Sequence, residues 1–331
     1  MSATIRDIKE QTGLALATIS KYLNGGNVLP ENRIKIEAAI KDLNYEVNEI
    51  ARGLVTNKTR TVGVMVYGID SLFNGTLLKY ISEYLRKNGY GMLICASDND
   101  EELEAKNLKF LVSKKVDGII VIPVSTNSDF LLPAKNANVP VVLVDRSLAD
   151  ETYDCVKIDN RSSAYRAVNY LIEQNHKKIA VISSEVEYTG EERFKGYMDA
   201  MEKAGIPVKE EYKCCGTHSM EYGSEAMNRL MRLSDPPTAV FMTNYEITLG
   251  AVMVLNDMGK RIPDDVSLLG FDDLILSHLM KPDISVVIQP MKEMGEKAAE
   301  IILKKIKGSD EMPAEIVLGT RFSPGDSIRK L

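Results

Sequence analysis

Several acidic, basic and amide side chains in this sequence stand at the ends of short apolar runs, where buried strands would finish. Asp145 ends the run PVVLVD, Asp272 ends the run VSLLGFD, and Asn244 follows TAVFMT. Because the carboxyl ends of parallel strands converge on one crevice, we expect these side chains to surround a common ligand. Carboxylates and amides offer paired hydrogen-bond acceptors and donors, which suit the adjacent hydroxyl groups of a polyhydroxylated molecule. The chemistry indicated is binding.

Groups that would indicate catalysis or a metal centre do not occur in a recognisable pattern. The three histidines, His176, His218 and His278, form no H-x-x-x-H pair, and the four cysteines show no metal spacing. The sequence contains neither the G-x-G-x-x-G nor the G-x-x-x-x-G-K phosphate-binding pattern. We therefore expect no enzyme activity, no cofactor, no metal site and no disulfide.

Alternating strand and helix patterns provide the elements that must position these side chains. Near-continuous apolar runs are typical of parallel strands buried on both faces, and they occupy residues 62–68, 90–96, 117–124, 140–145, 178–184, 238–243 and 266–272. Amphipathic stretches between the runs predict helices at residues 77–87, 101–113, 162–173, 194–203, 222–233 and 247–258. The alternation predicts an α/β fold with doubly wound parallel sheets, and the division of strands about Asp159 predicts two similar lobes.

The first 45 residues have a different pattern, that of a three-helix unit. Thr4 with Asp7 forms a capping-box pattern at a helix start, and Gly13 suits a tight turn to a second helix. A third helix is predicted at residues 32–43, where Ile36 and Ile40 belong to an apolar stripe. Two short helices joined by a turn and supported by a third make a helix-turn-helix unit.

These residues resemble the headpiece of the LacI/GalR family of bacterial transcription regulators. The resemblance rests on Thr18-Ile19-Ser20-Lys21, Leu23-Asn24-Gly25, Leu43-Asn44-Tyr45 and Ala51-Arg52-Gly53-Leu54, and it extends along the whole chain. It implies a helix-turn-helix DNA-binding headpiece at residues 1–45, a hinge helix and linker at 46–60, and a two-lobed periplasmic-binding-protein-like core at 61–331. The first lobe would comprise about 61–159 and 291–318, and the second about 160–290 and 319–331.

The resemblance also implies which residues meet DNA. Base edges would be read by Leu16, Ala17 and Lys21, and phosphates would be contacted by Thr18, Ser20 and Asn24. Leu54 would wedge into the minor groove. Ala15 stands where the family usually has a Ser cap, and the spacing alone leaves open whether Leu16 is a core residue instead. The remaining DNA-binding positions implied are Thr4, Arg33, Asn48, Ala51 and Arg52.

In the core, the resemblance places ligand polar groups on Asp145, Arg193, Asn244 and Asp272, with Phe73, His218 and Met291 forming the walls. Three positions depart from the family pattern: Tyr245 replaces an Asp, Asn74 replaces a common aromatic, and Glu187 stands where purine-binding members carry an Arg. With Asp145, Glu187 and Asp272 in the site and only Arg193 to balance their charges, the site suits an anion poorly. We therefore expect a neutral sugar, or an amino sugar, in preference to a sugar phosphate or a purine.

Charge and composition set the remaining expectations. The chain has a net charge of −6, but residues 1–60 hold nine Lys/Arg against seven Asp/Glu, which weakly favours DNA as the partner of the N-terminal unit. No apolar run reaches the length of a membrane helix, and no signal segment follows Met1, so we expect a cytoplasmic protein. Without a leucine-zipper tail before Leu331, a homodimer on palindromic DNA is expected. The alternatives are a sugar-binding protein or a sugar-processing enzyme without a DNA role.

Overall fold

The computed structural model describes residues 3–45, 58–149, 153–185, 187–272 and 281–331. The chain divides into two compact units, Met1–Arg60 and Thr61–Leu331, and each is described by itself. None of the helices in these described ranges is long and apolar enough to cross a membrane.

The N-terminal unit is the predicted bundle of α1 (Ile5–Thr12), α2 (Leu16–Leu23) and α3 (Pro30–Asp42). The capping box is present, since the Asp7 carboxylate accepts hydrogen bonds from the backbone N–H of Thr4 at 2.7 Å and from its hydroxyl at 2.9 Å. Gly13 ends α1 with a φ of +68°, a left-handed conformation that glycine adopts without strain. The helices share a small core of Ile8, Ile19, Ile36 and Ala39.

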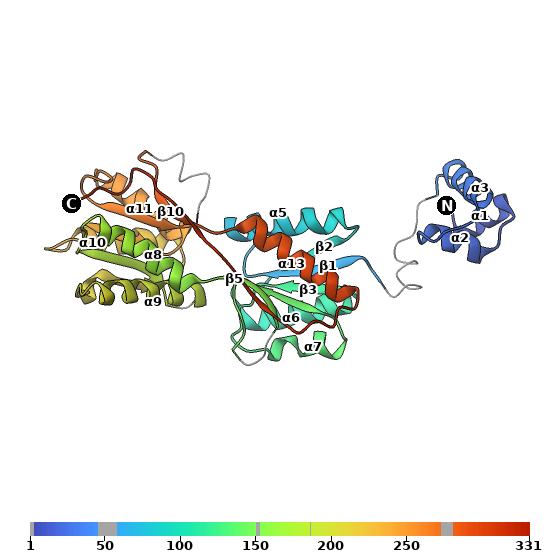
Figure 1. Ribbon diagram of the computed structural model, residues 1–331, viewed down its shortest axis with the longest axis horizontal. Helices are drawn as coiled ribbons and strands as arrows, with labels where there is room; N and C mark the ends of the chain where they lie inside the picture. Colours follow the sequence, from blue (N-terminus) through green and yellow to red (C-terminus); the bar gives the residue numbers. More distant parts are fainter. Residues whose placement is uncertain (1–2, 46–57, 150–152, 186, 273–280) are drawn as a thin grey trace. The chain divides into compact units, whose positions relative to one another are not determined.

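The first lobe of the core unit is a parallel sheet with helices on both faces (Figure 1). Its strand order is β11-β5-β4-β3-β1-β2. The strands are β1 (Thr61–Val66), β2 (Gly91–Ala96), β3 (Gly118–Val121), β4 (Val141–Val144), β5 (Asp154–Ile158) and β11 (Glu315–Leu318). One face is covered by α5 (Leu72–Lys87) and α13 (Met291–Ile306), and the other by α6 (Glu101–Ser113) and α7 (Leu132–Asn136).

The second lobe repeats this plan with the strand order β12-β10-β9-β8-β6-β7. Its strands are β6 (Ile179–Ser184), β7 (Lys213–Gly216), β8 (Ala239–Met242), β9 (Ser267–Phe271), β10 (Ser285–Ile288) and β12 (Arg321–Ser323), the last antiparallel to β10. The helix pair α8 (Asn160–Glu173) and α9 (Tyr188–Lys203) packs on one face, and the pair α10 (Met220–Met231) and α11 (Tyr245–Asp257) packs on the other.

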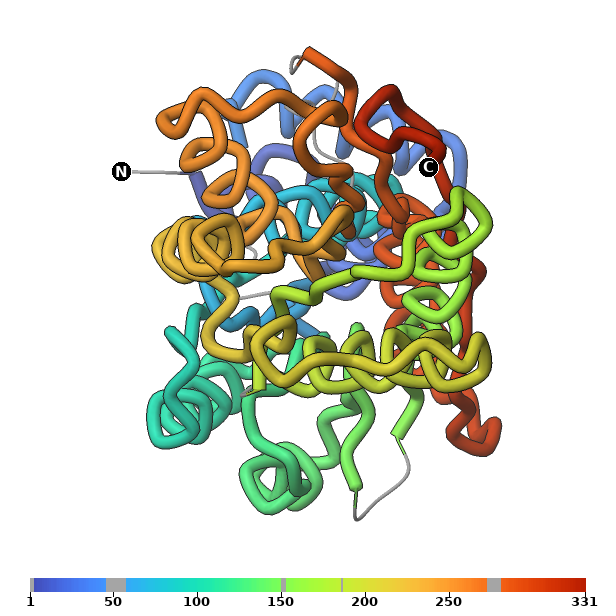
Figure 2. Tube along the Cα trace, turned by 90° about the vertical axis from the view of Figure 1, so that its left-hand side faces the viewer, coloured from blue at the N-terminus to red at the C-terminus, as the bar shows by residue number. Residues whose placement is uncertain are grey.

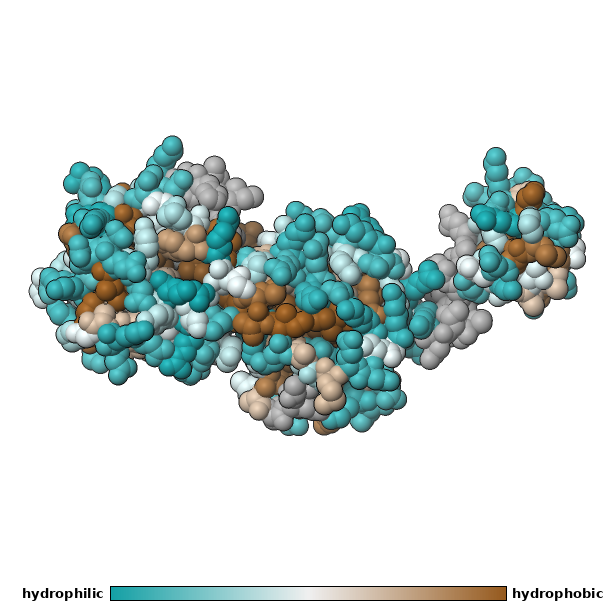
Figure 3. Space-filling view, in the orientation of Figure 1, coloured by the Kyte–Doolittle hydropathy of each residue, from teal (hydrophilic) through white to brown (hydrophobic). Residues whose placement is uncertain are grey.

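The chain passes between the two lobes after β5, after β10 and after β11. The last segment then returns to the end of α8, where the N–H of Leu331 donates to the carbonyl of Gln174 at 2.9 Å (Figure 2). In the view of Figure 3, apolar side chains gather across the middle of the first lobe. In the edge strand β11 of this lobe, Val317 is 53% exposed.

Several elements differ from the sequence-based expectations. Strands β5, β7, β10 and β12 were not predicted, because they are short and have at most three consecutive apolar residues; β7 reads KCCG and β10 reads SVVI. Helix α9 begins at Tyr188 and not at residue 194, so Arg193 lies inside a helix. The first turns of α5, α8 and α9 carry polar residues at the cleft, which hides their helical periodicity.

Candidate functional site

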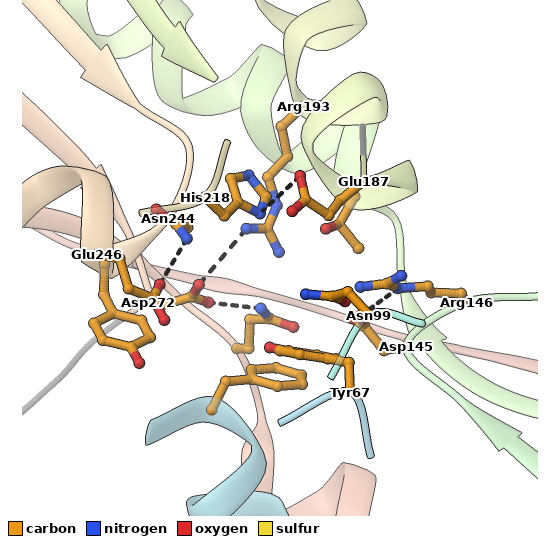
Figure 4. A pocket seen from close by; sticks show the side chains of 14 residues that line it. Tyr67, Asn99, Asp145, Arg146, Glu187, Arg193, His218, Asn244, Glu246 and Asp272 are labelled. Atoms are coloured by element: carbon orange, nitrogen blue, oxygen red, sulfur yellow. Dashed lines mark hydrogen bonds and ion pairs between the residues drawn. The ribbon is translucent and has the colours of Figure 1, made fainter. Parts of the chain in front are cut away.

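A pocket opens between the lobes at the carboxyl ends of the two sheets (Figure 4). The cavity volume is about 70 Å³. Side chains from both lobes line it: Tyr67, Phe73, Asn99, Asp145, Arg146, Glu187, Thr189, Arg193, His218, Asn244, Tyr245, Glu246, Asp272 and Gln289.

Asp272 is the most firmly held acidic group of the pocket. It follows β9 with a φ of +74°, a conformation that Asp tolerates better than most residues. Its carboxylate accepts a hydrogen bond of 2.6 Å from Nε2 of Gln289 and lies 3.6 Å from a guanidinium nitrogen of Arg193. Burial raises the pKa of Asp272, and the nearby charge of Arg193 partly offsets that effect.

Arg193 is fixed in turn by its other contacts. Its Nε donates to Oδ1 of Asn160 at 2.8 Å, and Nη1 donates to the carbonyl of Thr243 at 2.6 Å. The guanidinium lies over the ring of Phe271, 3.7 Å from the centroid. Only 3% of the residue is exposed, so its position is set before any ligand arrives.

Asn244 serves as the N-cap of α11 and as part of a polar chain. Its Oδ1 accepts from the N–H of Ile247 at 2.9 Å, while Nδ2 donates to Oε2 of Glu246 at 2.6 Å. Burial raises the pKa of Glu246 to about 7. The neighbouring Tyr245 connects the lobes, because its hydroxyl oxygen accepts a hydrogen bond from the N–H of Leu72 in α5 at 2.9 Å.

On the first-lobe side, Asp145 follows β4 with a φ of +70°. Its Oδ2 lies 3.6 Å from Nε of Arg146, and its Oδ1 has no hydrogen-bond partner although the residue is only 4% exposed. Arg146 donates from Nη1 to the carbonyl of Pro123 at 3.2 Å and faces the ring of Tyr67.

His218 and Glu187 form the wall shared by α9 and the start of α10. Nδ1 of His218 lies 3.8 Å from Oε2 of Glu187. Burial lowers the pKa of His218 to about 3 and raises that of Glu187, so the imidazole is neutral and the contact is not an ion pair.

The predicted ligand-binding residues mostly come together here. Phe73, Asp145, Arg193, His218, Asn244 and Asp272 all line the pocket. Met291 does not; it lines a smaller adjoining cavity with Leu72, Phe73 and Tyr245. The ligand assignment from sequence omitted Tyr67, Asn99, Glu246 and Gln289. Tyr67 could have been found, since it stands at the end of an apolar run.

Some buried polar atoms around the pocket have no hydrogen-bond partner within the described chain. They are Oδ1 of Asp145, Nε of Arg146, Oε2 of Glu187, Nε2 of His218 and Oε1 of Gln289. Leaving such atoms unsatisfied costs free energy, so their concentration at one place is typical of a site that binds a polar molecule.

In the N-terminal unit, α2 presents the residues implied to read bases. Leu16 is 39% exposed and lies outside the core, so the alternative of a core residue is wrong. Ala17, Lys21 and Asn24 are exposed as well, whereas Thr18 and Ser20 are half-buried. Their neighbour Ile19 is fully buried and anchors the helix.

Other implied DNA contacts are engaged within the unit. Nδ2 of Asn24 donates to the carbonyl of Ser20 at 2.8 Å, and Arg33 pairs with Glu37 at 2.8 Å. The side chain of Thr4 bonds Asp7. Four implied positions, Asn48, Ala51, Arg52 and Leu54, lie outside the described residues.

Comparison with known proteins identifies the family. Residues 59–323 match the family model described as periplasmic binding proteins and sugar binding domain of LacI family. The chain is 33% identical to catabolite control protein A of Priestia megaterium over 92% of both chains. It is 32% identical to the transcriptional repressor PurR of Actinobacillus pleuropneumoniae serotype 3 (strain JL03), over 92% of this chain and 91% of that one.

A solved structure of the transcriptional regulator CelR in complex with cellobiose matches with a TM-score of 0.74 and 26% identity, over 98% of this chain and 99% of the other. These relatives are regulators and not enzymes. The helix-turn-helix unit and the two-lobed core agree with these relatives, whose matches cover most of the chain. The protein belongs to the LacI family of DNA-binding transcriptional regulators.

Proposed function

We propose that this regulator represses carbohydrate-utilisation genes in the cytoplasm and responds to a small sugar without negative charge. The observation that carries the proposal is the interlobe pocket, in which buried polar atoms from both lobes lack partners. A ligand that satisfies both sides favours one arrangement of the lobes over another, and this differential affinity is what lets a ligand change DNA binding.

The chemistry of the pocket supports a sugar over a purine or a sugar phosphate. Carboxylates and the Gln289 carbonyl accept hydrogen bonds from hydroxyl groups, and the ring of Phe73 offers a flat apolar face. A phosphate would meet four carboxylates, those of Asp145, Glu187, Glu246 and Asp272, against two guanidinium groups, those of Arg146 and Arg193. The similarity to CelR, whose structure is a complex with the sugar cellobiose, is further support.

For DNA, we propose that α2 enters the major groove with Leu16, Ala17 and Lys21 on base edges. Leu16 and Ala17 lack hydrogen-bonding groups, so they would contact thymine methyl groups, whereas Lys21 would donate to a guanine edge. Residues 1–45 form the headpiece in this proposal, 46–60 the hinge and 61–331 the effector-binding core. Each headpiece is small, so a homodimer on a palindromic operator would double its contacts.

A matched pair of lysine variants tests the DNA assignment. Lys21→Ala should weaken operator binding and relax discrimination at one base position, because a good bidentate base contact contributes roughly 1–3 kcal/mol. Lys41→Ala, in exposed α3, removes the same charge and should alter binding much less. Gel retardation on an operator and its single-base variants measures both. A uniform loss across all variants of the operator would make Lys21 a phosphate contact.

The ligand assignment is tested by thermal shift with a panel of neutral sugars, amino sugars, sugar phosphates and purine bases. Bound ligand raises the unfolding temperature according to concentration over Kd. A sugar that raises it should also change operator retardation. Stabilisation by purine bases alone would overturn the proposed effector class.

A further inference from the structure

The charges around the pocket do not balance. Its described lining includes four carboxylates, Asp145, Glu187, Glu246 and Asp272, but only two guanidinium groups, those of Arg146 and Arg193. His218 adds no positive charge, since burial lowers its pKa to about 3. With the carboxylates ionised, these lining residues carry a formal charge of −2.

Both arginines are already committed to neighbouring aspartates. Arg193 lies 3.6 Å from Asp272, and Arg146 lies 3.6 Å from Asp145. Their remaining described hydrogen bonds go to Asn160 and to the backbone. Neither arginine makes a described ion pair with the two glutamates of the pocket.

Glu246 is therefore held by neutral groups alone. Its carboxylate accepts from Nδ2 of Asn244 at 2.6 Å and from the hydroxyl of Tyr245. Burial disfavours the ionised form of Glu246, and the negative charge of Asp272 adds a smaller effect in the same direction. Arg193 is the cation whose charge favours ionisation of both groups.

The unpartnered atoms independently indicate a ligand rich in hydrogen-bond donors. Asp145 and Gln289 are each only 4% exposed, and each keeps one acceptor oxygen without a partner. Oε2 of Glu187 is a third such acceptor, against a single atom that can only donate, Nε of Arg146. Hydroxyl groups can donate to such acceptors, and a protonated amine donates three hydrogen bonds and accepts none, so an amino sugar as a whole fits this surplus.

We propose that the effector is an amino sugar whose ammonium group binds between Glu246 and Asp272. The inference rests on the proposed function and makes its ligand class specific. The hydroxyl groups of the sugar would then satisfy Asp145 and Gln289, while the ammonium replaces the proton that burial otherwise favours on Glu246. Glu246 becomes the residue that distinguishes amino sugars from their hydroxyl counterparts.

The test compares hexoses that differ only at the amine: glucosamine, galactosamine and mannosamine, each with its parent hexose and its N-acetyl derivative. Calorimetry on the full chain should show one free amine binding about tenfold or more tightly than its parent hexose. In Glu246→Gln, which keeps the shape and an acceptor for Asn244, that preference should fall to within about threefold. Glu221→Gln, an exposed position at the pocket mouth, removes the same charge and should keep the preference.

A second measurement detects the proton that Glu246 should release when the amine binds. The groups that face Glu246 are Tyr245 on its own helix, Asp272 after β9, Arg193 on α9 and Tyr67 after β1. The pKa of Glu246 is about 7 without ligand, so amine binding at pH 6.5 should release protons to the buffer. Calorimetry in two buffers of different ionisation heat detects the release, which should diminish in Glu246→Gln.

Each result separates the two proposals. If a parent hexose binds as tightly as its amine, or if no amino sugar binds while neutral sugars do, the amine inference is wrong and the sugar-responsive function stands. If purine bases alone bind, both are wrong. Loss of all binding in Glu246→Gln with an unchanged unfolding temperature would make Glu246 a general ligand contact, which also overturns its role in discrimination.

Discussion

Asp145 in the first lobe and Asp272 in the second occupy equivalent places in the two sheets. Each follows the third strand of the sheet order, β4 or β9, and each has a left-handed φ, +70° and +74°. Each N–H donates to a carbonyl at the corresponding place on the neighbouring strand, that of Val156 or Val287, at 2.9 Å. The two lobes thus present the same acid on the same scaffold.

Their side chains differ in what already surrounds them. Each lies 3.6 Å from an arginine, Arg193 or Arg146, but Asp272 also accepts a hydrogen bond from Gln289, whereas Asp145 keeps an oxygen without a partner. The second-lobe acid is preorganised without ligand, and the first-lobe acid depends on ligand to satisfy it. Most pocket residues also come from the second lobe. The second lobe thus supplies most of the binding surface.

The largest effect is expected for Asp272→Asn, because Asn tolerates the left-handed backbone and only the charge is lost. The charge of Arg193 would then be buried without compensation. Ligand affinity should fall about tenfold to a hundredfold, and the ligand-free protein should unfold at a lower temperature. Calorimetry and thermal unfolding measure the two quantities. Unchanged ligand affinity would remove Asp272 from the site.

Asp145→Asn should separate the two measurements. Ligand affinity should fall by about tenfold, the scale of one lost charge-assisted hydrogen bond. The unfolding temperature without ligand should fall less than for Asp272→Asn, because the lost attraction of Arg146 is partly offset by removal of an unsatisfied buried carboxylate oxygen. A loss of stability equal to that of Asp272→Asn would contradict the difference drawn between the lobes.

The smallest effect concerns the contact between the lobes themselves. Tyr245→Phe keeps the ring and removes the hydrogen bonds that the hydroxyl group makes with the N–H of Leu72 and the carboxylate of Glu246. Each bond contributes about 1 kcal/mol, so the unfolding temperature should drop by roughly 2–4 °C for each bond lost. If it does not change, the lobes are held together by their other contacts and by the chain crossings, and Tyr245 is only a wall of the pocket.

Elements with strong local signals were predictable from the sequence. Helix α6 has the predicted bounds, because Asp100 caps it by accepting from the N–H groups of Glu102 and Leu103 and an apolar stripe runs along it. The three headpiece helices were predictable from their shared apolar residues, and the first also from the capping box of Thr4 and Asp7. Strand β5 was not predictable, because the charged residues Asp154 and Lys157 interrupt its apolar pattern. Lys157 pairs with Val317 of the edge strand β11.

The candidate site was predictable where strands end in polar residues and not where helices or crossings supply the group. Asp145, Asn244 and Asp272 stand at strand ends, so their convergence follows from parallel topology. Gln289 reaches Asp272 only because the chain crosses between the lobes beside β9, and Glu246 becomes notable only through its burial next to Asp272. Such distances depend on tertiary packing, which no local pattern encodes.

The chain crossings between the lobes also set an order of events during synthesis. The headpiece helices have their own core within residues 3–45, so they can fold as soon as that stretch has left the ribosome. The first sheet, by contrast, lacks its edge strand until Leu318 is made, and the second lacks its edge strand until Ser323. The two sheets are therefore completed by almost the same residues. A chain interrupted before them would have a folded headpiece but an incomplete effector-binding core.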